Sequence, residues 1–210
     1  MSMSDGPRLT PARLESFSDG VFSIAATLLV LDLHVPDVTN DLAAALASQW
    51  SNYITYVVSF ATIGIIWVNH HSLFSHVRHV DRRLLFLNLV LLMVVSAIPF
   101  PTALLSRYVG TGDQSHIAAA VYGGVMVVMS VAFTLLWRHV THDRKLLGTH
   151  LDPARAGHDS LLFSAGLLAY LLGVGVSFVS AELALALYGL VALYYVFPWL
   201  PGTSTSPQSA

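Results

Sequence analysis

Residues 13–33 contain the side chains of this chain whose types and spacing most directly suggest a chemical role. The segment begins with charge, turns polar and then runs apolar as far as Leu31. Asp19 lies inside the segment, and Asp32 closes it. An ionisable residue within an apolar membrane helix is costly in lipid. We therefore expect Asp19 to face protein or a water-filled cavity.

The same segment predicts an apolar stripe along one side of a helix. At about 100° per residue, three side chains fall within roughly 60° of one another, namely Ile24, Leu28 and Leu31. The hydroxyl of Thr27 lies at the edge of this stripe, whereas Asp19 and Ser23 lie well away from it. The helix is thus expected to have an apolar stripe and a separate polar side.

The composition is that of an integral membrane protein. The 210 residues are 55% hydrophobic and 10% charged, with a mean hydropathy of +0.66, whereas soluble domains are usually about 25% charged. The formal net charge of −2 says little about partners. The chain has no cysteine, which excludes disulfides and thiolate metal sites. Residues 1–10 include no long apolar run before a cleavage site, so we expect no cleaved signal peptide.

Six apolar segments are long enough, with their flanks, to cross a membrane as helices. We expect these spans at residues 11–33, 50–69, 84–105, 116–137, 161–180 and 183–200. Pro99 and Pro101 should kink or end the third span, and a short helix is expected at 42–46. The chain is therefore predicted to be all-α, with a flexible N-terminus at 1–10, a six-helix membrane domain at 11–200 and a disordered tail at 201–210.

The basic residues predict the orientation. With six spans, both ends of the chain lie on the same side of the membrane. Nine of the ten Lys and Arg residues fall on that side, namely Arg8, Arg13, Arg78, Arg82, Arg83, Arg138, Arg144, Lys145 and Arg155. Only Arg107 falls on the other side. The positive-inside rule then predicts a multi-pass protein of the cell membrane with both termini in the cytoplasm.

Two motifs resemble those of the transmembrane protein 175 family. The first is Arg13-x-x-x-Phe17-Ser18-Asp19-Gly20 with the apolar run that follows it to Asp32. The second is Trp67-Val68-Asn69-His70-His71, at the end of the second predicted span. The members are potassium channels of prokaryotic membranes and of animal endolysosomes. The resemblance covers the six-helix layout of about residues 12–200; the animal members carry two such repeats and this chain carries one.

The resemblance implies a pore made by several copies of the chain. In the family, the first helices of four subunits line the pore, and the residue seven positions after the motif Phe forms the narrowest ring. That residue is Ile24 here, and Leu28 and Leu31 match the next two rings. Such apolar rings can gate by dewetting and can discriminate by the hydration that an ion must shed, which potassium gives up more readily than sodium. The expected protein is a homotetrameric channel for potassium ions, embedded in lipid, with no cofactor.

Thr27 has two interpretations. Its hydroxyl could hold a partly hydrated cation, or it could hydrogen-bond to the carbonyl of Ser23 in its own helix, as threonines in helices commonly do.

The resemblance also implies a structural and gating-related network that does not coordinate the ion. The motif residues assigned to it are Arg13, Phe17, Ser18, Asp19, Asn69, His70 and His71. We expect Arg13, Ser18, Asp19 and one or both histidines to form a buried contact between the first span and the next two. Arg13 and Asp19 are six residues apart and not on one helix face, so a direct pair is not expected. A histidine member could make the network respond to pH.

No motif points to catalysis, a metal or nucleic acid. The sequence has no His-Glu-x-x-His, phosphate-binding glycine loop or nucleophile elbow, so an enzyme is not expected. The pairs His76/His79 and His139/His142 have no cysteines and few acidic residues nearby, so no structural zinc site is expected. The arginines of residues 78–83 fit a flank near anionic lipid better than a nucleic-acid patch. Glycines at 123–124, 173 and 175 are expected to allow close helix packing.

The Thr-Val-Gly-Tyr-Gly carbonyl filter of conventional potassium channels is absent, so a channel would have to select with side chains.

Two alternatives to a channel remain. The runner-up is a secondary cation transporter or exchanger, which needs acidic or histidine ligands facing each other near the membrane midplane. Asp19 and Asp32 lie near opposite ends of one predicted helix, which argues against such a site. A membrane enzyme is the weakest alternative.

Overall fold

The computed structural model describes residues 10–37, 40–142, 146 and 153–196, and of residues 153–164 and 196 it describes the backbone alone. In this part of the chain the elements are α1 (Pro11–Leu28), a 3-10 turn η1 (Leu29–Asp32), α2 (Leu42–Ser48), α3 (Trp50–Phe74), α4 (Arg82–Ala97), α5 (Pro99–Tyr108), α6 (Asp113–His142), α7 (Pro153–Ser177) and α8 (Ala181–Val196). The prediction of an all-α protein is confirmed. The expectations for residues 1–9, for Arg144 and Lys145, and for the tail after Val196 lie outside the described residues.

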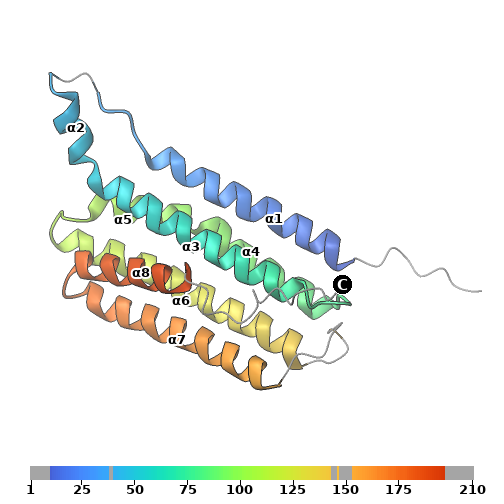
Figure 1. The fold of residues 1–210 in the computed structure, drawn as a ribbon. Helices are drawn as coiled ribbons and strands as arrows, with labels where there is room; N and C mark the ends of the chain where they lie inside the picture. The colour runs from blue at the N-terminus through green and yellow to red at the C-terminus, as the bar shows by residue number, and fades with distance from the viewer. Residues whose placement is uncertain (1–9, 38–39, 143–145, 147–152, 197–210) are drawn as a thin grey trace, which may run out of the picture.

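The helices form an elongated bundle with α1 along one edge and α7 along the opposite edge (Figure 1). Four segments are long and apolar enough to cross a membrane, namely Pro11–Asp32, Trp50–Phe74, Arg82–Tyr108 and Asp113–His142. Two shorter apolar helices, Ala165–Ser177 and Ala181–Tyr195, follow them. These six segments correspond to the six predicted spans, and the chain is a multi-pass membrane protein. The helices α3 and α6 run past the predicted spans, because hydropathy marks the membrane crossing and not the end of the helix.

Prolines divide the third span as predicted. Helix α4 ends at Ala97, and α5 begins at Pro99, which occupies the first position of the new helix. Proline is accepted there because the first N–H groups of a helix have no intrahelical partner. The turn from α5 to α6 contains Gly110 and Gly112 with φ of 79° and 73°, a backbone conformation that other residues rarely adopt.

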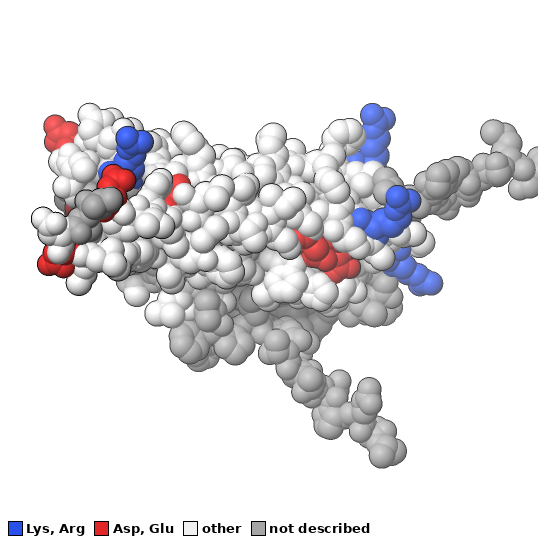
Figure 2. Space-filling view, turned by 90° about the horizontal axis from the view of Figure 1, so that it is seen from above, with Lys and Arg blue, Asp and Glu red and all other residues white. Residues whose placement is uncertain are grey.

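Lys and Arg side chains gather mainly at one end of the bundle, where α1 begins (Figure 2). Contacts between distant segments bring the helix ends together there. The carboxylate of Asp81, just before α4, accepts from His139 Nε2 near the end of α6 at 3.0 Å, and the N–H of Arg78 donates to the carbonyl of Leu146 at 2.7 Å. The basic residues that the sequence assigned to one side of the membrane therefore lie mainly at one end of the bundle.

Two glycines let the tyrosine Tyr188 enter the space between α6, α7 and α8. A Cβ at Gly123 would fall on the Tyr188 hydroxyl, and one at Gly173 would fall on its ring. That hydroxyl donates to the carbonyl of Ala119 at 3.1 Å in the buried core. In contrast, a Cβ at Gly124 meets nothing within 4 Å. Only one glycine of each predicted pair is thus needed for close packing.

We expect Gly123→Ala to lower the stability of the purified protein by about 1–3 kcal/mol, because the added methyl displaces Tyr188 from its hydrogen bond. The matched control is Gly124→Ala, which should leave stability unchanged or raise it by up to about 1 kcal/mol through helix propensity. Thermal unfolding in detergent compares the two variants. Equal melting temperatures for both would contradict the close approach of α8 to α6.

Candidate functional site

One side of α1 packs against α3 and α4, and the other side is uncovered in the single chain (Figure 1). The packed side consists of Leu14, Ser18, Phe22, Ala25 and Leu29, all buried. The uncovered side includes the predicted stripe: Ile24 is 61% exposed, Leu28 42% and Leu31 69%. The residues of the predicted stripe are therefore separate from the residues with which α1 packs against the other helices.

The 3-10 turn η1 aligns the last two residues of the stripe, Leu28 and Leu31. A 3-10 helix has three residues per turn, so side chains three apart eclipse one another. Leu31 therefore falls almost directly in line with Leu28, closer than the α-helical spacing predicts. Phe17 also lies on this side and is 55% exposed, so in the single chain it stands apart from the buried contacts of α1 with α3 and α4.

The Thr27 hydroxyl is exposed beside the stripe. It donates to the carbonyl of Ile24 at 2.9 Å, three residues back, and not to that of Ser23. The local hydrogen bond that the sequence suggested is therefore present with a different acceptor. The hydroxyl oxygen keeps lone pairs with which it can accept a hydrogen bond or face a cation.

A buried hydrogen-bonded chain links α1, α4 and α3. Ser18 Oγ donates to the carbonyl of Leu14 at 2.9 Å and accepts from Asn88 Nδ2 at 3.0 Å. The other end of the same amide, Asn88 Oδ1, accepts from His70 Nε2 at 2.8 Å. An amide oxygen only accepts, so the proton of the His70 ring is on Nε2 and its Nδ1, which has no partner, is the unprotonated nitrogen. The His70 ring stacks on Phe74 at 4.3 Å between ring centroids.

Two further contacts hold the first half of α1 against α3. Asp19 Oδ1 accepts from Trp67 Nε1 at 2.8 Å, and Glu15 Oε1 lies 2.7 Å from His71 Nδ1. Both contacts are partly open to the surroundings: Trp67 is 41% exposed and the His71 side chain 59%. Asp19 thus faces protein, and its partner is the tryptophan of the second motif instead of a histidine.

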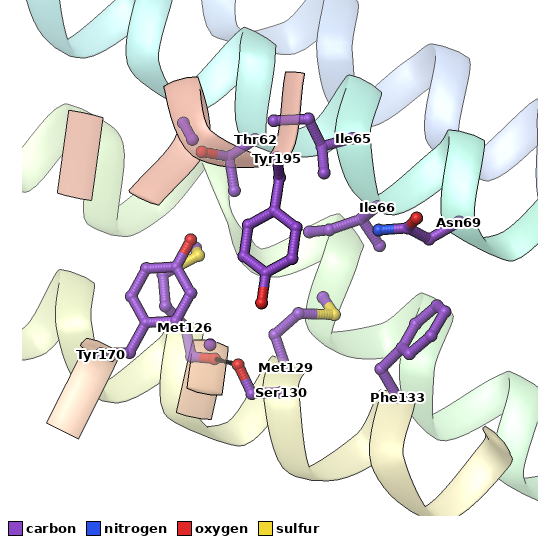
Figure 3. A pocket seen from close by; sticks show the side chains of 12 residues that line it. Thr62, Ile65, Ile66, Asn69, Met126, Met129, Ser130, Phe133, Tyr170 and Tyr195 are labelled. Carbon is purple, nitrogen blue, oxygen red and sulfur yellow. Dashed lines mark hydrogen bonds between the residues drawn. The ribbon is translucent and has the colours of Figure 1, made fainter. Parts of the chain in front are cut away.

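The predicted single network is therefore three separate contacts, and besides Phe17 two further members of the predicted set lie elsewhere. Arg13 is exposed, and within the described part of the chain no hydrogen bond or ion pair joins it to Ser18 or Asp19. Asn69 lies on the far side of α3, where it lines a mainly apolar cavity of about 70 Å³ that opens towards α6, α7 and α8. Figure 3 shows its amide at one side of this cavity and the Tyr195 ring inside it.

Sequence reasoning missed three contributing residues: Glu15, Trp67 and Asn88. The signal for Asn88 was available, because it is the one polar residue in the apolar run 84–95 and a buried amide needs partners. Glu15 lies four residues before Asp19 and therefore on the same helix face.

This chain is similar to a family of known membrane proteins. The profile of the family described as endosomal/lysosomal potassium channel TMEM175 matches residues 13–99. A protein of Streptomyces collinus named as a potassium channel is 53% identical over 191 residues, which cover 90% of this chain and 93% of the relative. Another so named, from Chamaesiphon minutus, is 38% identical and covers 87% and 92% of the two chains.

A solved structure extends the comparison to the fold. The crystal structure of a lysosomal potassium-selective channel TMEM175 homolog from Chamaesiphon minutus superposes with a TM-score of 0.79 at 37% identity, and covers 89% of this chain and 96% of the other. The profile covers α1 from Arg13 onwards and the whole of α3 and α4, and so includes the residues of the three contacts described above. The full-length matches extend the similarity to the remaining helices, and the chain therefore belongs to the TMEM175 family.

Proposed function

We propose that this chain is the subunit of a potassium-permeable channel in which α1 lines the pore. The observation that carries the proposal is the uncovered stripe of Ile24, Leu28 and Leu31 on a membrane-spanning helix whose opposite side is fully packed. Two full-length bacterial relatives named as potassium channels support the ion. Conduction would be passive, and the protein would not be an enzyme.

The stripe on a single helix cannot enclose a pore, so the proposal requires several copies of the chain. We propose a homotetramer around a central axis, in which each apolar residue contributes to a ring. The ring at Ile24 is the main constriction, because a narrow apolar ring excludes water and forces an entering ion to shed hydration. Sodium holds its water more tightly and is penalised more. The hydroxyl of Thr27, one turn from Ile24, offers a polar contact to the ion next to this constriction.

The contacts on the packed side of α1 would set the tilt and rotation of the pore helix. The buried chain from Ser18 through Asn88 to His70 and the Asp19–Trp67 and Glu15–His71 contacts would together fix the first half of α1. In this role the motif residues act through the position of α1 and do not touch the ion. The basic end of the bundle would lie in the cytoplasm of the cell, with both termini on that side.

Ion flux into liposomes that contain the purified protein tests the proposal. We expect potassium to equilibrate down its own gradient, faster than sodium, with no ion or proton gradient in the opposite direction. Chemical cross-linking in the same liposomes should give a ladder that ends at four subunits. Flux that appears only with an opposing cation or proton gradient would instead identify a secondary transporter.

A further inference from the structure

Basic side chains line an open hollow where α4 begins and α6 ends. The hollow measures about 630 Å³, and its described lining consists of Arg83, Leu135, Arg138, His139 and His142. It lies at the basic end of the bundle, at the edge of the two longest apolar segments. The proposed pore does not use it, because it is formed by α4 and α6 and not by α1.

The acidic residue Asp81 contacts His139 in the lining of the hollow, and its carboxylate already has hydrogen-bond partners. Asp81 accepts from the N–H of Leu84 at 2.6 Å and from His139 Nε2 at 3.0 Å. Partial burial alone would raise the pKa of Asp81, but these hydrogen bonds and nearby Arg83 hold it below its ordinary value, so the group is an anion at neutral pH. Asp81 therefore orients His139. Within the described residues, neither Arg83 nor Arg138 forms an ion pair.

An apolar stripe leads from the hollow along α6 towards the middle of the membrane. Its residues are Val128, Val131 and Leu135, which are 41–52% exposed. Arg138 and His142 continue the same spacing of three and four residues, so all five lie on one helix face. At 1.5 Å per residue, Val128 lies about 15 Å from Arg138 along the axis, close to half the thickness of a bilayer core. The stripe and the hollow thus have the length and polarity of one lipid in one leaflet.

We propose that this hollow and stripe bind an anionic phospholipid of the leaflet next to the basic end of the bundle. The lipid phosphate lies between the guanidinium groups of Arg83 and Arg138, which suit phosphate because their N–H donors pair with its oxygens two at a time. His142 borders the headgroup, and an acyl chain lies along Leu135 towards Val128. The proposal differs from the general attraction of basic flanks to anionic membranes, because it assigns the lipid to two of several arginines at this end.

Native mass spectrometry of the full-length protein with added phosphatidylglycerol or phosphatidylcholine tests the assignment. We expect the wild type to retain phosphatidylglycerol in preference, and the double variant Arg83→Gln, Arg138→Gln to lose about thirtyfold of this affinity, as two arginines at an anionic surface should provide. The matched control is Arg78→Gln, Arg82→Gln, which removes the same charge at the same end but outside the hollow, and it should retain the lipid.

Equal loss in the two double variants would overturn the proposal in favour of diffuse attraction. Competition separates a lipid from a soluble anion: glycerol 1-phosphate without acyl chains should fail to displace the lipid at the same concentration, and its success would also overturn the proposal. Val131→Asn tests the stripe without changing any charge and should weaken retention. Melting temperatures of all variants confirm that each is folded before its lipid binding is compared.

Discussion

Replacing Ile24 by asparagine is expected to raise cation flux through the reconstituted protein about tenfold, which corresponds to lowering the barrier by about 1.4 kcal/mol. Ile24 is 61% exposed on the uncovered side of α1, so the change does not disturb the packing against α3 and α4. A tetramer would carry four new amides in one ring. Their oxygens can coordinate an ion where the apolar ring excludes water. We expect the preference for potassium over sodium to fall together with the barrier to ion flux.

The matched control is Ile54→Asn, the same substitution at a 44% exposed isoleucine of α3. It should leave both flux and selectivity at the wild-type level. Potassium and sodium fluxes are measured side by side in liposomes with equal protein content. Flux that ignores Ile24, or that responds equally to the change at Ile54, would show that α1 does not line the pathway.

The second large effect is expected at the buried hydrogen bonds. Asn88→Leu removes the acceptor of His70 Nε2 and leaves both ring nitrogens of a fully buried histidine without partners. An unsatisfied buried donor costs about 2 kcal/mol, which should lower the melting temperature by about 4–8 °C for a chain of this size. The same change at Asn69, which lines the apolar cavity on the other side of α3, should have little effect.

A second substitution distinguishes a lost hydrogen bond from poor packing. In the Asn88→Leu background, His70→Phe removes the unpaired ring nitrogens and places an aromatic ring beside Phe22 and Phe74. Replacing both partners by apolar groups can be nearly neutral, so the double variant should regain most of the lost stability. A double variant less stable than Asn88→Leu alone would contradict the assigned role of the amide. Thermal unfolding in detergent gives the melting temperatures of the wild type, Asn88→Leu, Asn69→Leu and the double variant.

Much of the architecture was predictable because the membrane imposes simple rules on the chain. Hydropathy located the apolar segments, and Pro99 marked the break between α4 and α5. The 3.6-residue period separated Ile24 and Leu28 from the side of α1 that packs against other helices. These features depend on residues close together in sequence and on their preference for lipid, water or a helix end.

The partners of the polar motif were not predictable in the same way. The sequence placed Ser18, Asp19 and His70 near one another in depth, but it could not indicate that Ser18 meets Asn88, that Asp19 meets Trp67 or that Glu15 meets His71. Each of these pairs depends on how far α1, α3 and α4 are rotated about their axes. Rotating α3 by one residue, about 100°, would place Asn69 instead of His70 at the contact with α1.

Hydropathy thus located the apolar segments, motif spacing indicated the family, and helical periodicity separated the two sides of α1, because all three are local properties of the chain. The folded bundle was needed to show which polar groups satisfy one another, that Phe17, Arg13 and Asn69 stand outside these contacts, and that Arg83 and Arg138 line one hollow. A helix specifies its faces by its own residues, whereas the partner of each face is set by the packing of all the helices.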